Sequence, residues 1–170
     1  MESIGFTNLN LDDVDGVYSL WSDEGATLFT NFKYLATKDE CQQRLEKMMA
    51  FYGQNRDHFG PFVIRGTDGN FLGLTGGDAD GSAPGTYEIW YFVRRDYWGK
   101  KVATTAVQHL LGLMKNSGRV KLVRAEAVVD NEPSWRFLEK LGFSRSGQIL
   151  AGHKKNGKTW DRYCYSMPVI

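Results

Sequence analysis

Two strand-like runs joined by a loop and a helix constrain the fold of this 170-residue chain more than any other feature. Residues 86–93 (TYEIWYFV) are aromatic and β-branched on both faces, which predicts a central, buried strand. Residues 94–101 form a basic loop, and the apolar spacing from Ala103 to Lys115 predicts an amphipathic helix. KLVRAEAVV (121–129) is a second strand and completes a strand–helix–strand unit. Such a unit places its two strands parallel in one sheet, which predicts an α/β fold.

The segments on either side of this unit add helices and strands in a regular order. Apolar spacing predicts a helix over 10–21, and another begins at the capping-box sequence TKDE (37–40). A further helix starts after Asn131, carries Pro133 in its first turn and ends at Gly142. Further strands are predicted at 61–65, 70–76, 143–151 and 159–168. This order predicts a single domain, residues 1–170, whose sheet has mixed strand direction.

Composition narrows the classes of function. Lys and Arg number 21 against 20 Asp and Glu, so the net charge is +1. A protein that binds nucleic acid through phosphate contacts needs an excess of basic residues, and we therefore expect no nucleic-acid partner. No apolar run approaches the roughly 20 residues of a membrane span, so we expect no membrane partner.

Cellular location and metal content are also predicted from the sequence. The first residues, MESIGFTNLNLDD, lack the basic and apolar regions of a secretory signal. The two cysteines, Cys41 and Cys164, are too few for a disulfide framework or a cysteine-rich zinc site. We therefore expect a cytoplasmic, metal-free protein.

The loop after the strand at 86–93 is a candidate anion site. A helix N-terminus presents unpaired backbone N–H groups and the positive end of the helix dipole, which suit a pyrophosphate. Four cations within eight residues add attraction: Arg94, Arg95, Lys100 and Lys101. The alternative interpretation is a solvated basic turn that only closes the unit. The loop matches neither the GxGxxG nor the GxxxxGK[ST] phosphate-binding motif.

Two sequence blocks in this order resemble the GCN5-related N-acetyltransferase (GNAT) superfamily, and within it the ribosomal-protein N-terminal acetyltransferase branch. YEIWYFVRRDYWGKKVATTAV is similar to that branch's strand, pyrophosphate loop and helix, and AVVDNEPSWRFLEKLGF (127–143) to its second signature. KNGKTWDRYCYSM resembles its closing strand pair. The resemblance, which spans nearly the whole chain, implies a mostly antiparallel mixed sheet with a V-shaped splay between two central parallel strands and helices on both faces. It also implies acetyl-CoA as co-substrate.

The resemblance implies an acetyl-CoA site built from one strand end, the loop and two helix starts. The implied acetyl-CoA-binding residues are Phe92, Val93, Arg94, Trp98, Gly99, Lys100, Lys101, Val102, Ala103, Thr104, Asn131 and Ser134. Lys101 departs from the family pattern because it stands where the central loop glycine is expected. A side chain there restricts φ and adds bulk beside the pyrophosphate, so we expect weakened binding unless its ammonium contacts a phosphate.

Catalysis requires a base for the amine and a donor for the leaving sulfur. Glu88 is the first candidate base, since a carboxylate buried among Tyr87, Ile89 and Trp90 would have a raised pKa. The alternative for Glu88 is a structural pair with an arginine. Glu126 is a weaker candidate, for which exposure to solvent or an ion pair is favoured. Ser134 is the hydroxyl that the branch would place near the sulfur, and its alternative role is local bonding in a helix N-terminus.

Two further positions bear on mechanism. Many superfamily members carry a tyrosine acid where this sequence has Leu138, so that acid is missing. Asn131 is interpreted as both a helix cap and a contact for the pantetheine arm.

Two functions follow. The first is acetyl transfer to a primary amine, either a protein N-terminus or a small molecule, by direct attack in a ternary complex. The second is a non-catalytic acyl-CoA-binding or regulatory protein that kept the fold, motivated by Lys101 and Leu138. Either would act as a monomer or a homodimer.

Overall fold

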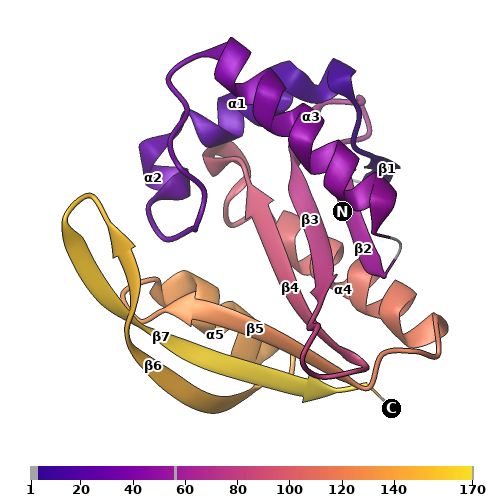
Figure 1. Ribbon diagram of the computed structural model, residues 1–170, viewed down its shortest axis with the longest axis vertical. Helices are drawn as coiled ribbons and strands as arrows, with labels where there is room; N and C mark the ends of the chain where they lie inside the picture. Colours follow the sequence, from indigo (N-terminus) through magenta and orange to yellow (C-terminus); the bar gives the residue numbers. More distant parts are fainter. Residues whose placement is uncertain (1–3, 56, 170) are drawn as a thin grey trace.

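The computed structural model describes residues 4–55 and 57–169, which form one seven-stranded sheet with helices on both faces (Figure 1). Two 3-10 turns, Leu11–Asp13 and Arg95–Tyr97, precede α1 and α4. The helices are α1 (Val14–Trp21), α2 (Glu24–Thr27), α3 (Lys38–Gln54), α4 (Val102–Asn116) and α5 (Glu132–Lys140). The strands are β1 (Gly5–Asn8), β2 (His58–Arg65), β3 (Phe71–Ala79), β4 (Thr86–Val93), β5 (Leu122–Val128), β6 (Ser144–Lys155) and β7 (Lys158–Pro168).

The sheet has the strand order β1-β2-β3-β4-β5-β7-β6. Five of its six strand pairs are antiparallel, and only β4 and β5 are parallel. The connection between these two strands is α4, as the strand–helix–strand pattern requires. The predicted α/β fold with a mixed, mostly antiparallel sheet is confirmed.

The helices cover the two faces of the sheet in separate groups. α1 and α3 bury Val17, Trp21 and Leu45 against Val63 and Leu74 of the sheet. On the other face, α4 and α5 enclose a larger core, to which both parallel strands, β4 and β5, contribute side chains. Its members include Tyr87, Ile89, Val107, Leu110, Val123, Ala125 and Leu138.

Several elements differ from the sequence prediction. β1 and the one-turn helix α2 were not predicted, because four-residue elements carry too little apolar periodicity to be recognised. The predicted helix over 10–21 begins instead as a 3-10 turn, which Asn10 caps by accepting a hydrogen bond from the Asp12 amide. The capping box at 37–40 is half formed: Thr37 caps α3, but the Glu40 carboxylate accepts from the Ala36 amide.

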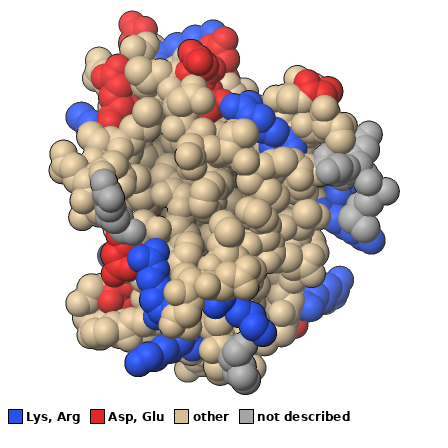
Figure 2. Space-filling model, turned by 90° about the vertical axis from the view of Figure 1, so that its right-hand side faces the viewer, with Lys and Arg blue, Asp and Glu red and all other residues tan. Residues whose placement is uncertain are grey.

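The surface carries both signs of charge. On the face in Figure 2, acidic and basic side chains lie around a centre that is largely uncharged. This distribution matches the near-equal numbers of acidic and basic residues in the sequence. None of the helices in the described ranges is long and apolar enough to cross a membrane.

Candidate active site

A fork in the sheet forms the centre of the site. β4 and β5 pair only through Thr86–Glu88 and Leu122–Arg124, whereas β4 continues to pair with β3 as far as Val93. Beyond this point the two strands diverge (Figure 1). The predicted V-shaped splay is therefore present. Within the described residues, the β5-facing edge of β4 from Ile89 onward has no strand partner, so its backbone polar groups make no sheet hydrogen bonds on that side.

The alternation of side chains along β4 separates two chemical environments. Tyr87, Ile89 and Tyr91 pack with the core under α4 and α5. Trp90 and Phe92 pack with the core under α1 and α3. Because successive side chains on a strand point to opposite faces, Glu88 lies on the α1/α3 side and Tyr91 on the α4/α5 side.

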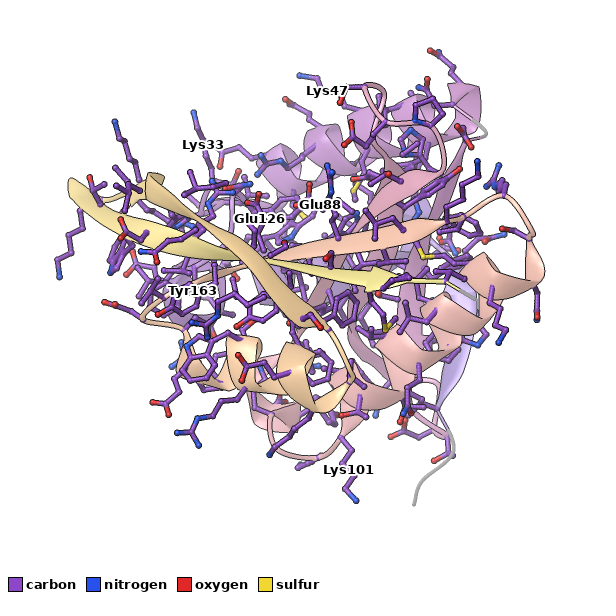
Figure 3. All side chains as sticks on the ribbon, turned by 90° about the horizontal axis from the view of Figure 1, so that it is seen from below. Lys33, Lys47, Glu88, Lys101, Glu126 and Tyr163 are labelled. Atoms are coloured by element: carbon purple, nitrogen blue, oxygen red, sulfur yellow. The ribbon has the colours of Figure 1, made fainter. Side chains whose placement is uncertain are left out.

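On the α1/α3 side, Glu88 faces an open hollow of about 410 Å³. Glu126 of β5 also lines this hollow, and Figure 3 shows the two carboxylates near each other on the α3 side of the strands. Glu126 forms an ion pair with Arg162 at 2.5 Å, which confirms the interpretation favoured for it. Arg124 pairs with Asp80 at 2.9 Å. Among the described residues no ion pair involves Glu88, so its carboxylate differs from its neighbours in being unpaired.

Glu88 is exposed rather than buried, contrary to the sequence expectation. The reason is that α1 and α3 pack over β2 and β3 and leave this end of β4 facing the hollow. The pKa of Glu88 is nevertheless raised, first by desolvation inside the hollow and then by the negative charges of Glu126 and Asp78. The Arg162 guanidinium partly opposes this rise. A carboxylate with a raised pKa and open access suits proton uptake from a ligand.

On the α4/α5 side, two hydroxyl groups meet. Ser134, in the first turn of α5, lies with its Oγ 2.9 Å from the phenolic oxygen of Tyr91. Burial raises the pKa of Tyr91 to about 12, so the phenol stays protonated at neutral pH. Leu138, where the resemblance would place a tyrosine, is fully buried in the core and offers no polar group.

Asn131 is the N-cap residue of α5 by position but not by side-chain bonding. Its carbonyl accepts hydrogen bonds from the amides of Ser134 and Trp135, at 3.0 and 3.3 Å. Its side chain makes no capping hydrogen bond, which corrects the predicted cap. The φ and ψ of Asn131, −87° and 63°, lie outside the extended region typical of side-chain N-caps.

The basic loop leads into the N-terminus of α4 on this same side. Lys101 is the N-cap residue, and its φ of 63° and ψ of 9° are left-handed. Gly99 also has a positive φ, 75°. The first intrahelical bond runs from the Thr105 amide to the Lys101 carbonyl, so the preceding amides of the helix have no intrahelical acceptor. Those amides belong to the predicted residues Val102, Ala103 and Thr104.

The four cations of the loop differ in their surroundings. Lys100 and Lys101 are exposed, and Figure 3 shows Lys101 extending away from the protein on the side opposite to Glu88. Arg94 and Arg95 are held by carboxylates, Asp96 at 2.7 Å and Asp23 respectively. Among the described residues, Lys100 and Lys101 are therefore the cations of this loop that have no carboxylate partner.

The end of β4 is already partly occupied by protein contacts. The Trp98 indole N–H donates to the Val93 carbonyl at 2.7 Å, and the Arg94 amide donates to the Leu72 carbonyl at 2.9 Å. A carbonyl accepts two hydrogen bonds, so Val93 retains one acceptor position. Phe92 directs its ring to the opposite face, edge-on to Phe32 at 4.7 Å.

Sequence reasoning missed Tyr91 and Arg162 as parts of this site. Tyr91 is found by counting along β4, since it is three residues after Glu88 and therefore on the other face. Arg162 gives no local signal, because its contact with Glu126 depends on the register of β7 against β5. No group of three or more His, Cys, Asp or Glu side chains in the described ranges is arranged to hold a metal ion.

Comparison with known proteins connects this geometry to a family. A family model described as an acetyltransferase (GNAT) domain matches residues 4–144. The uncharacterized N-acetyltransferase p20 of Bacillus licheniformis is 24% identical over 166 residues, 98% of this chain and 93% of that protein.

Solved acetyltransferases share the fold at low sequence identity. The spermidine N-acetyltransferase of Vibrio cholerae, in complex with CoA and spermine, has a TM-score of 0.84 at 16% identity, covering 98% of this chain and 95% of that one. The acetyl transferase of Salmonella typhimurium that modifies the N-terminal serine of ribosomal protein L7/L12 has a TM-score of 0.84 at 15% identity, covering 99% and 96%.

Proposed function

Because this chain belongs to the acetyltransferase (GNAT) domain family, we propose that it transfers the acetyl group of acetyl-CoA to a primary amine by direct attack in a ternary complex. The observation that carries the proposal is the fork after Glu88 and Arg124, with a lone carboxylate on one side and a hydroxyl pair on the other. The two sides suit the two substrates: the carboxylate faces the amine, and the hydroxyl pair faces the thioester sulfur.

The residues around the fork fit coenzyme A. The unpaired amides at the start of α4 and the exposed Lys100 suit its pyrophosphate. The free backbone edge of β4 and the uncommitted Asn131 side chain suit the amide-bearing pantetheine arm. When bound, acetyl-CoA supplies the activated acetyl group.

The chain's own residues carry the proton and charge movements. Glu88 takes a proton from the amine, directly or through a water molecule, so that the nitrogen attacks with a free lone pair. A backbone N–H on the free edge of β4 donates to the thioester oxygen as negative charge develops there, an effect worth about 3–4 kcal/mol in other acyl-transfer sites. Ser134 donates to the sulfur as the carbon–sulfur bond breaks. No protein nucleophile is required.

The acceptor is a primary amine, either a protein N-terminus or a small molecule, and it enters from the hollow beside Glu88. Glu88 and Glu126 attract the ammonium form of such a group, and Arg162 neutralises only one of them. The structural neighbours named for spermidine and for a ribosomal protein define the two acceptor classes to test first.

The test combines binding with turnover. We expect calorimetric binding of acetyl-CoA and release of free thiol that depends on the amine, measured over a panel of diamines and peptide N-termini. Glu88→Gln should retain acetyl-CoA binding but lose most thiol release, whereas the control Glu46→Gln, on the exposed face of α3, should behave as the wild type. Binding without thiol release for any amine would favour the non-catalytic acyl-CoA-binding alternative.

A further inference from the structure

The hydrogen bond between Tyr91 and Ser134 connects β4, one strand of the fork, with α5, the helix that follows the other strand, β5. Tyr91 lies on β4 and Ser134 on α5, 43 residues apart in the chain, with 2.9 Å between their hydroxyl oxygens. The Tyr91 ring is fixed edge-on against Phe137 of α5, with ring centroids 5.0 Å apart. The phenol therefore has a defined position beside Ser134.

The direction of this hydrogen bond follows from its surroundings. A phenol is a stronger donor than an aliphatic hydroxyl, and among the described residues Tyr91 Oη has no other hydrogen-bond partner. If Ser134 donated, the buried phenolic hydrogen would have no acceptor, which is costly. With Tyr91 donating, both oxygens are satisfied and only the Ser134 hydrogen is left without a protein acceptor.

We propose that Tyr91 is a positioning residue that fixes the orientation of the Ser134 hydroxyl toward the thioester sulfur. This inference rests on the proposed function. As the amine nitrogen bonds to the acetyl carbon, the carbon–sulfur bond breaks and the sulfur keeps the electron pair. Ser134 donates a hydrogen bond to that developing thiolate while Tyr91 donates to Ser134. The amine proton leaves through Glu88 to water, and the thiolate takes its proton from water, so the reaction balances.

Tyr91→Phe tests the proposal, because it removes one oxygen and keeps the contact with Phe137. We expect kcat to fall about tenfold, the effect of losing the one hydrogen bond that orients Ser134, with acetyl-CoA affinity unchanged. In a Ser134→Ala background the same change should have no further effect. The matched control is Tyr87→Phe, on the same face of β4, whose hydroxyl donates to Asp57 at 2.5 Å outside the fork and whose loss should leave kcat unchanged.

A binding measurement tests the same contact without turnover. Above the thiol pKa, free coenzyme A presents a thiolate to Ser134, whereas desulfo-coenzyme A does not. At a pH of about 10.5, Tyr91→Phe should weaken calorimetric binding of coenzyme A several-fold and leave desulfo-coenzyme A unchanged. An equal effect on both ligands, or an undiminished kcat loss in the Ser134→Ala background, would overturn the proposal. A wild type that binds both ligands but releases no thiol would count against the proposed function alone.

Discussion

Lys101 adopts a backbone conformation that favours glycine. Its φ of 63° is left-handed, which costs a residue with a side chain roughly 1–2 kcal/mol. Glycine avoids this cost but loses about 0.5–1 kcal/mol more backbone entropy on folding. Lys101→Gly should therefore raise the free energy of unfolding by about 0.5–1 kcal/mol, measured by urea denaturation.

Two substitutions of Lys101 distinguish the effect of its backbone strain on acetyl-CoA binding from the effect of its charge. Lys101→Gly should leave acetyl-CoA affinity unchanged or tighten it, because the backbone then approaches the pyrophosphate more closely. The control Lys101→Ala removes the ammonium but keeps the Cβ. A large loss of affinity in both variants would show instead that the lysine contacts a phosphate.

Glu88 should give the reaction a pH dependence with a defined sign. Glu88 accepts a proton only when ionised, and its raised pKa means that the ionised form is lost at a higher pH than for an ordinary glutamate. Wild-type kcat should fall as pH drops through this raised pKa. Glu88→Gln should lower kcat at pH 7 by about 100-fold or more and lose this acid limb.

Stability provides an independent check on Glu88. A raised pKa means that the folded protein disfavours the ionised carboxylate, so above that pKa the charge lowers the stability of the fold. Glu88→Gln should therefore unfold at a slightly higher temperature than the wild type at pH 7 and at the same temperature at pH 4. A variant that is less stable at pH 7 would contradict the desolvation argument.

Among the elements, the β6–β7 hairpin holds the segment after α2 in place. The Lys155 ammonium donates to the carbonyl oxygens of Thr27, Thr30 and Phe32, the last at 2.7 Å. His153, buried in β6, bonds through Nε2 to the Leu28 carbonyl at 2.9 Å. The β6–β7 hairpin thus fixes the loop after α2, and Phe32 of this loop packs against Phe92 of β4.

Of the two substrates, loss of the Lys155 hydrogen bonds should affect binding of the amine only. Lys155→Met leaves three carbonyls without their donor and should lower the free energy of unfolding by about 2 kcal/mol. It should also raise the KM for the amine while the calorimetric affinity for acetyl-CoA stays unchanged, because the fork is intact. Lys154→Met, on the neighbouring exposed residue, is the control and should change neither quantity. An equal loss of acetyl-CoA affinity would refute the separation of the two sides.

Prediction from sequence succeeded where the periodicity was long. β4 has the predicted bounds, and α4 and β5 differ from theirs by one residue at each end. It failed at β1 and α2, whose four residues each are ordered by contacts made elsewhere in the fold. β1 pairs with β2 more than fifty residues later, and α2 is held by the β6–β7 hairpin.

The candidate site shows the same limit. Lys101 could be singled out because the family resemblance places a glycine at this loop position. The exposure of Glu88 could not be predicted, because it depends on how far α1 and α3 extend over the sheet. The bond between Tyr91 and Ser134 depends on the docking of α5, which the local sequence does not specify.

At the scale of the whole molecule, the fork divides the sheet but not the core. Tyr87 and Ile89 of β4 share one buried cluster with Val123 of β5 and Leu138 of α5. We therefore expect the protein to unfold in a single cooperative transition, although β4 and β5 diverge after Glu88 and Arg124. A ligand that occupies the fork contacts both arms and should stabilise that whole transition.

The size of this stabilisation follows from mass action. With acetyl-CoA at about 100 times its Kd, the free energy of unfolding should rise by about 2.7 kcal/mol. For a chain of this length each kcal/mol raises Tm by roughly 2–4 °C, so the calorimetric midpoint should move up by about 5–10 °C. Glu88→Gln should show the same shift, since Glu88 faces the amine. Two calorimetric peaks, with only one moved by acetyl-CoA, would show that the arms unfold separately and that the ligand contacts one arm alone.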